Sequence, residues 1–430
     1  MLSLPTEIVG YIFDLVRHLV EPPLNFPQVY PYSTKPIISA LKLANVDRRW
    51  RDIALSTPAL WSQVAIGPRT SPDLLTLLFG RSKTYLLEIM IDAGNGILPS
   101  TLMAMCVGVA SRCRLLAIQF SDPDIFSSLF NQLASPSLEA ISIQTFGMVA
   151  VSLYYKLSAQ KAPSLNSIYT GGGIDIETID CARVTTLYLA CSGEELFQII
   201  AACPNLQLAS FYVEGGALAD TCPLVLAPHL EELHLQFGED GTWVMLTKTI
   251  QHISAPVLEL LNISPSSQSR DFQPADFIST ISTNPPLGLF SVNSVIFDFP
   301  LSPQNHDVYS EATAMLRAVY NFIGLRILGV KNLSVHSLRL AFQAHPLVVP
   351  RVNTLILCQS GQNTNSDWTS QDSPDEIAII LDLRRQNASV ADFTTLALDG
   401  DSRSHFEEIK IRTESSGCRV VSTNTHSYPT

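Results

Sequence analysis

The side chains that most often carry out catalysis are dispersed in this sequence, without the spacing that catalysis needs. His229 and His234 stand an odd number of residues apart, which places them on opposite faces of a strand. Glu231 and Glu232 are adjacent, like two other pairs of glutamates, and such pairs fit a solvated surface better than acid–base catalysis. The motifs G-x-S-x-G, H-E-x-x-H and G-x-G-x-x-G are absent. We therefore expect no enzymatic activity.

The cysteines and the glycine cluster predict neither a metal site nor a cofactor site. The eight cysteines include no C-x-x-C pair, so we expect reduced, buried thiols, as in cytosolic or nuclear proteins. Gly171, Gly172 and Gly173 predict a turn, because the Lys and Ser/Thr of a phosphate-binding loop do not follow them.

Composition and charge indicate a folded, acidic protein. The chain of 430 residues has 27 Lys and Arg against 39 Asp and Glu, a net charge of −12, which disfavours nucleic acid as a partner. Only 15% of residues are charged and 46% are hydrophobic, which predicts extensive buried surface. The N-terminus lacks a basic signal region, and the apolar runs near 102–110 and 196–203 are too short to cross a bilayer. We therefore expect cytoplasmic or nuclear residence and no membrane partner.

Two amphipathic segments near the N-terminus are predicted to form helices with large apolar faces. Leu43, Val46, Trp50 and Ile53 recur three or four residues apart, which predicts one helix face from about residue 41 until Pro58 ends the helix. A second helix is predicted over residues 4–16, with a proline in its first turn and a glutamate near its positive end. A module this small cannot bury all of its large apolar side chains, so the rest of the chain or another protein must cover some of them.

Together the two segments resemble an F-box of the fungal type. The pattern is LP-x-E-I-x(3)-IF-x-LV, a gap, then L-x-x-A-x-V-x-R-x-W-R-x-IA-x(3)-P-x-LW, and it spans residues 1–66. Two features depart from the family: a proline-rich insertion at 21–39, expected to be an extended loop, and Asp47, where a small residue or Cys is usual.

The resemblance implies that this module docks on the Skp adaptor, and through it on cullin, in an SCF-type ubiquitin ligase. Docking of this kind places apolar anchors of helices into a partner's groove. The residues expected to contact the adaptor are Leu4, Pro5, Ile8, Ile12, Phe13, Val46, Trp50, Ile53 and Trp61.

Residues 67–412 repeat the pattern x-L-x-x-L-x-L. Copies between residues 138 and 258 start about 19 to 28 residues apart, within the period of leucine-rich repeats, and later intervals lengthen to about 27 to 41. The segments between copies have helical patterns, so we expect an α/β fold in which parallel strands stack with helical connections as an irregular leucine-rich-repeat solenoid. The repeats lack the family's usual Asn, and a doubly wound α/β domain is the competing fold. The clearest copies begin at Leu138, Leu165, Val184, Leu206, Leu230 and Leu258.

Three domains and one leading function follow. Residues 1–66 form the F-box-like module, 67–412 the repeats, and 413–430 a polar tail expected to be disordered. The leading hypothesis is a substrate receptor whose repeats hold a target protein that the sequence does not identify. The alternatives are an F-box protein that works with the adaptor outside a ligase, and an enzyme with an unfamiliar site in the α/β region.

Overall fold

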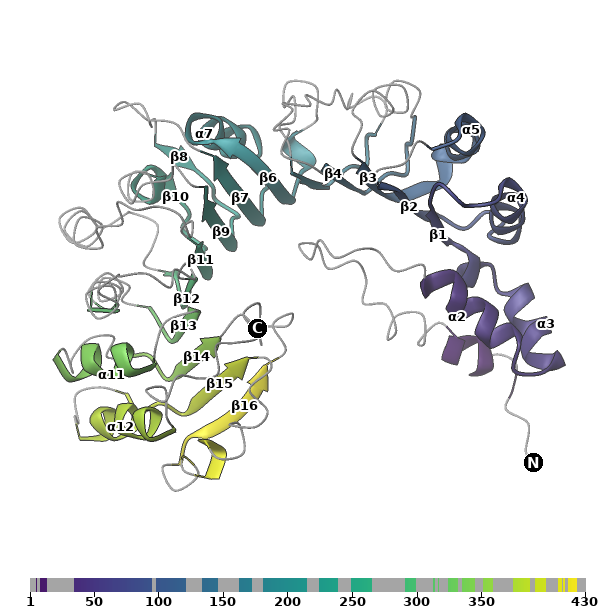
Figure 1. Cartoon of the computed structure of the whole chain (residues 1–430). Helices are drawn as coiled ribbons and strands as arrows, with labels where there is room; N and C mark the ends of the chain where they lie inside the picture. Colours follow the sequence, from purple (N-terminus) through teal and green to yellow (C-terminus); the bar gives the residue numbers. More distant parts are fainter. Residues whose placement is uncertain are drawn as a thin grey trace. The chain divides into compact units, whose positions relative to one another are not determined.

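The structure is a computed structural model (Figure 1) that divides into two compact units, Met1–Ala190 and Cys191–Thr430. The residues that the structure describes are 5, 8–13, 35–94, 98–120, 134–145, 162–171, 181–214, 224–238, 249–264, 291–298, 312–313, 316, 324–331, 335–344, 351–358, 374–386, 391–399, 409–411, 413 and 417–423.

The N-terminal helices differ from the single helix predicted from residue 41 onward. Residues 8–13 are helical, α2 spans Lys35–Ala44, and α3 spans Arg48–Ser56, followed by the 3-10 helix η1 at Pro58–Trp61. The predicted helix is interrupted because Asp47 is the N-cap of α3, its Oδ1 accepting a 2.7 Å hydrogen bond from the N–H of Trp50. The predicted end of this helix before Pro58 is confirmed.

The last five residues of the predicted proline-rich insertion at 21–39 are helical, not an extended loop. Residues 35–39 belong to α2, with Pro36 as its second residue, where a proline costs no helical hydrogen bond. The remaining insertion residues, 21–34, lie outside the described part of the chain.

The first unit is a parallel sheet whose strands follow the order of the sequence, β1-β2-β3-β4-β5-β6. Helices α4 and α5 lie on one side of β1 to β3 (Figure 1). The strands are β1 Gln63–Ile66, β2 Leu87–Gly94, β3 Cys113–Phe120, β4 Ala140–Thr145, β5 Ser167–Thr170 and β6 Thr186–Ser192. The helices are α4 Pro72–Arg81, α5 Ser100–Gly108, η2 Ala110–Arg112 and η4 Cys181–Arg183.

The second unit repeats this arrangement in the order β7-β9-β11-β12-β13-β14-β15-β16, and β10 pairs with β8 apart from it. Every pairing among its described strands is parallel. The strands are β7 Leu208–Glu214, β8 Val225–Leu226, β9 Glu232–Phe237, β10 Ile253–Ser254, β11 Leu260–Ser264, β12 Ser294–Asp298, β13 Ile327–Lys331, β14 Thr354–Cys358, β15 Thr395–Asp399 and β16 Arg419–Thr423. The helices are α7 Gly193–Ala202, α11 Val335–Ala344 and α12 Pro374–Arg385.

The turn before each strand ties one repeat to the previous one. The N–H of Leu230 donates to the C=O of Ala227 at 3.3 Å, which closes the turn. The N–H of Glu231 then donates to the C=O of Gln207 at 2.8 Å, and the N–H of Glu259 donates to the C=O of Glu231 at 2.8 Å. Because this bond recurs from repeat to repeat, each copy of the sequence pattern adds one strand in register with its neighbour.

The prediction of an α/β fold with a large parallel sheet and helical connections is confirmed. Its leucine-rich-repeat character stays a prediction. Leu233 and Leu235 of β9 are buried while the residues between them are partly exposed, as period-two alternation requires. Of the nine segments between copies whose patterns predict helices, 72–79, 100–110, 194–202, 334–344 and 375–386 correspond to α4, α5, α7, α11 and α12. Of the other four, 275–281 lies wholly, and 125–134, 244–253 and 309–323 lie partly, outside the described residues.

The prediction that residues 413–430 are disordered is wrong for one part of them. Arg419–Thr423 forms β16, which pairs with β15 across five residues and adds backbone hydrogen bonds that a polar composition does not reveal. Cys418, directly before this strand, is buried. Residues 424–430 lie outside the described part.

Candidate functional site

The nine residues predicted to contact an adaptor divide into two groups in the structure. Phe13, Ile53 and Trp61 are buried in the chain itself. Ile8 and Val46 are 46% and 58% exposed. Pro5 is also exposed, Ile12 and Trp50 are half-buried, and Leu4 lies outside the described residues.

Trp61 joins the helical module to the first repeat. Its indole Nε1 donates to the backbone C=O of Ala54 at 2.8 Å, so the polar end of this buried side chain is satisfied. The guanidinium carbon of Arg81, at the end of α4, lies 4.5 Å from the centroid of the Trp61 ring, a cation–π contact. The side chain of Trp61 is therefore used inside the chain.

Trp50 packs inward on one side only. Its ring centroid lies 5.1 Å from that of Phe13, with the two rings tilted by 58°. Phe13 is fully buried by such contacts, whereas part of Trp50 stays accessible. This pair packs the N-terminal helix against α3 and leaves Trp50 partly accessible.

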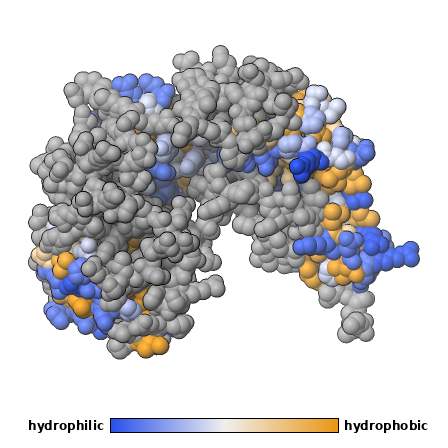
Figure 2. All heavy atoms as spheres, in the orientation of Figure 1, coloured by the Kyte–Doolittle hydropathy of each residue, from blue (hydrophilic) through white to orange (hydrophobic). Residues whose placement is uncertain are grey.

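Three further exposed apolar side chains are not among the nine predicted contacts: Tyr11 (63%), Leu41 and Leu55. Tyr11 lies three residues after Ile8, so the two side chains share a helix face. Figure 2 shows hydrophobic residues beside hydrophilic ones on the surface over α2 and α3. Helical periodicity beyond the F-box pattern is the signal that could have included Tyr11. We call Ile8, Tyr11, Leu41, Val46 and Leu55 the exposed apolar set.

On the outward side of the sheet in the second unit, polarity and exposure change from one strand to the next. Ser210, His234 and Asn262 occupy matched positions on β7, β9 and β11 and are partly exposed. In the same row, Ile296 on β12 and Ile356 on β14 are buried. The row therefore passes from polar and accessible to apolar and buried.

A short chain of polar contacts crosses the accessible part of this row. The side-chain amide Nδ2 of Asn262 lies 3.1 Å from Nδ1 of His234, and Nε2 of His234 lies 3.6 Å from Oε2 of Glu232. A neutral imidazole that accepts at Nδ1 carries its proton on Nε2, which faces the carboxylate. These groups have hydrogen-bonding capacity, but they lack a nucleophile held next to a base.

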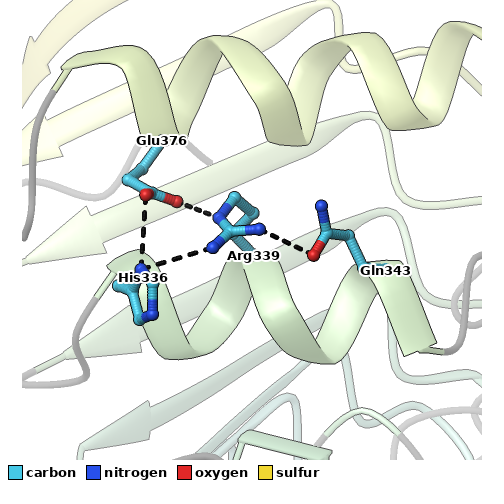
Figure 3. A network of polar contacts seen from close by, with 4 residues as sticks. All are labelled: His336, Arg339, Gln343 and Glu376. Atoms are coloured by element: carbon cyan, nitrogen blue, oxygen red, sulfur yellow. Dashed lines mark hydrogen bonds and ion pairs between the residues drawn. The ribbon is translucent and has the colours of Figure 1, made fainter.

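A second polar cluster joins helices α11 and α12 (Figure 3). Glu376 of α12 accepts from Arg339 Nε and lies 3.2 Å from Nδ1 of His336, while Arg339 Nη1 donates to Gln343 at 2.6 Å. Arg339 and Glu376 are only 14% and 16% exposed, so water screens this pair less than a surface pair. Its role is to fasten one helix to the next.

Within the described residues, no group of three or more His, Cys, Asp or Glu side chains could hold a metal ion. Burial raises the pKa values of the Cys106 and Cys113 thiols to about 12, so both are protonated at neutral pH. Such thiols are poor nucleophiles and poor metal ligands. None of the described helices has the length and apolar character needed to span a membrane.

Comparison with known proteins leaves the family open. No protein-family model matches the chain, and no curated protein matches it. One similar solved structure is a protein from Bacteroides fragilis, at 12% identity over 74% of this chain and 76% of that chain, with a TM-score of 0.36. Another is the yeast complex of Rad7 and Elc1, at 16% identity over 92% of this chain and 89% of that chain, with a TM-score of 0.29. TM-scores this low do not establish a shared fold.

Proposed function

We propose that this chain is a substrate receptor of an SCF-type ubiquitin ligase. Its N-terminal helices dock on the Skp adaptor, and its parallel-strand repeats bind a target protein. The chain does no chemistry in this role; it holds the target near subunits that catalyse transfer.

The observation that carries the proposal is the exposed apolar set. Soluble proteins tolerate single exposed apolar side chains, but five large ones within about fifty residues of a small helical module favour a binding surface. Ile8 and Val46 belong both to this set and to the nine residues predicted to contact the adaptor. Arg48, Arg51 and Asp52 on α3 are exposed and supply a polar rim of the kind that surrounds apolar anchors.

The burial of three predicted anchors narrows the contact surface. Because Phe13, Ile53 and Trp61 are buried, we propose that they shape the module while Pro5, Ile8, Ile12, Val46 and one edge of Trp50 touch the adaptor. Replacing Ile53 would therefore change folding and binding together. Exposed positions make the cleaner test.

The test is affinity purification of the full chain from cells, with partners identified by mass spectrometry. The double variant Ile8→Glu, Val46→Glu places charges at the proposed contact and should lose the adaptor. The matched control Leu224→Glu, Leu226→Glu alters side chains in the second unit that are 60% and 62% exposed, and it should keep the adaptor. If the wild-type chain brings down no Skp adaptor, or if both variants keep it, the proposal is wrong.

The same purification separates the two F-box hypotheses. A ligase receptor brings down cullin together with the adaptor. Recovery of the adaptor without cullin would instead favour an F-box protein acting outside a ligase.

A further inference from the structure

One stretch of the chain accounts for much of its net negative charge. Residues 184–247 contain no Lys and no Arg, although the whole chain has 27. Their eight acidic residues give this stretch a charge of −8, against −12 for the whole protein. A potential this one-sided attracts cations and basic segments and repels acidic ones. The acidic residues are Glu194, Glu195, Glu214, Asp220, Glu231, Glu232, Glu239 and Asp240.

Glu231 and Glu232 of this stretch, together with Glu259 beyond it, lie on or beside the accessible strand face described above. Glu232 faces outward on β9, and its side chain is 38% exposed. Glu231 lies at the turn before β9 and Glu259 at the turn before β11; both are exposed, and the backbone bond between them places them side by side. None of these three carboxylates pairs with a Lys or Arg of the described chain.

The same face offers contacts that a long basic side chain can use. Leu208 and Leu260 flank Glu232 in register on the two neighbouring strands, and both are partly exposed. Lys and Arg lay their aliphatic stems on such apolar side chains while the charged end reaches a carboxylate. His234 and Asn262, in the next row, can hydrogen-bond to the backbone or side chains of a bound segment.

The outward row that contains His234 is partly exposed on β7, β9 and β11. Ile296 and Ile356 are 1% and 2% exposed, so a partner cannot reach this row at β12 and β14. The neighbouring row, which contains Glu232, stays partly exposed from Leu260 to Thr395. The three carboxylates therefore lie beside the strands on which both rows are accessible.

We propose that the outward face of β7, β9 and β11 binds a Lys- or Arg-containing segment of the target protein. This inference rests on the proposed function, because it names the chemistry of the target that the repeats hold. Specificity comes from charge complementarity, and acidic proteins are excluded by repulsion.

The test starts with a random peptide library displayed on phage and selected on the immobilised full-length chain. The strongest peptide is then titrated by fluorescence anisotropy against three proteins. These are the wild type, the face variant Glu231→Gln, Glu232→Gln, Glu259→Gln, and a control variant with the same change in charge. The control, Asp73→Asn, Asp92→Asn, Glu139→Gln, alters three exposed carboxylates of the first unit.

We expect selected peptides enriched in Lys and Arg, affinity about tenfold weaker for the face variant, and little change for the control. Added salt should weaken wild-type binding, because screening reduces attraction between exposed charges. Selection of no peptide, selection of peptides without basic enrichment, or equal loss in both variants would overturn the inference. Adaptor binding is a separate readout: a chain that captures basic peptides but no adaptor refutes only the proposed function.

Discussion

Gly329 packs closely against the neighbouring strand, which leads to a specific prediction. This residue sits in the middle of β13, in register with Ile296 of β12. A Cβ atom at position 329 would lie 2.8 Å from Ile296 Cγ1, 3.2 Å from its Cγ2 and 3.3 Å from its Cβ. Ile296 is buried, so its side chain has little room to move away.

The magnitudes decide the sign of the effect of Gly329→Ala. Removing a glycine restricts the unfolded chain and would by itself stabilise the fold by about 0.4–1 kcal/mol. Forcing a methyl group into a packed interior costs about 1–3 kcal/mol. We therefore expect a net loss of about 1–2 kcal/mol in the free energy of unfolding of the second unit.

The assay combines urea denaturation with hydrogen exchange read by mass spectrometry, which localises the loss to β12–β14. Ile296→Ala removes both Cγ atoms, so the double variant with Gly329→Ala should be more stable than the sum of the single effects by more than about 0.5 kcal/mol. The control is Gly80→Ala in α4, where no atom lies within 4 Å of the added Cβ and where helix propensity predicts a gain. A Gly329→Ala chain as stable as the wild type, or single effects that simply add, would refute the steric argument.

Three further predictions concern groups whose partners are defined. Arg384→Lys should lower the free energy of unfolding, measured by urea titration, by about 2–3 kcal/mol. The buried guanidinium donates to two backbone carbonyls at 2.8 and 2.9 Å, and Lys cannot reproduce its planar geometry. Unchanged stability would contradict this reasoning. Asp47→Ala should cost about 0.5–2 kcal/mol by losing the hydrogen bond from Trp50, whereas Asp47→Asn should recover most of it, as thermal circular dichroism can measure. Cys106 and Cys113 should resist iodoacetamide at pH 8 in the folded chain and react with it in urea. Their pKa values are about 12 in the folded chain, against 9.0 for the free thiol. The free energy of unfolding should therefore fall as the pH rises from 9 towards 12. Rapid labelling of both thiols in the folded chain would show that they are not buried.

Near the C-terminus, one buried arginine joins helix α12 to the turns before two strands. Arg384 of α12 is 1% exposed, and its Nη2 donates to the C=O of Val352 and of Ala391, at the entries to β14 and β15. Its guanidinium carbon lies 4.6 Å from the ring centroid of Phe393. Burial lowers the pKa of this guanidinium to about 10, yet it stays charged at neutral pH. One side chain thus fastens a helix to two successive strand turns.

Much of the repeat fold could be predicted from the sequence, because its causes are local. The alternation of apolar residues defines each strand, and the recurring distance between copies defines the stacking of parallel strands. Ser192 and Glu195 form a capping box at the start of α7, a pattern that the letters alone display. The runs SVIFD, ILGVK and TLILC of β12 to β14 also carry a signal: continuous apolar strands are typical of sheets buried on both faces.

The candidate contact surface could be predicted only in part. Periodicity identifies which residues share a face, but it does not say whether another element of the same chain covers that face. Trp61 and Val46 both fit the F-box pattern, yet Trp61 packs against Arg81, whereas Val46 is exposed in the turn between α2 and α3. Likewise β16 exists because β15 offers it a backbone edge.

The sequence by itself therefore determined the class of fold, the repeat spacing and the excess of acidic residues in 184–247, because each depends only on residue type and order. Only the tertiary structure decided which predicted contact residues are buried inside the chain, which outward strand residues of the second unit are accessible, and why residue 329 must be small. Those outcomes depend on contacts between residues that are distant in sequence, and no local pattern records them.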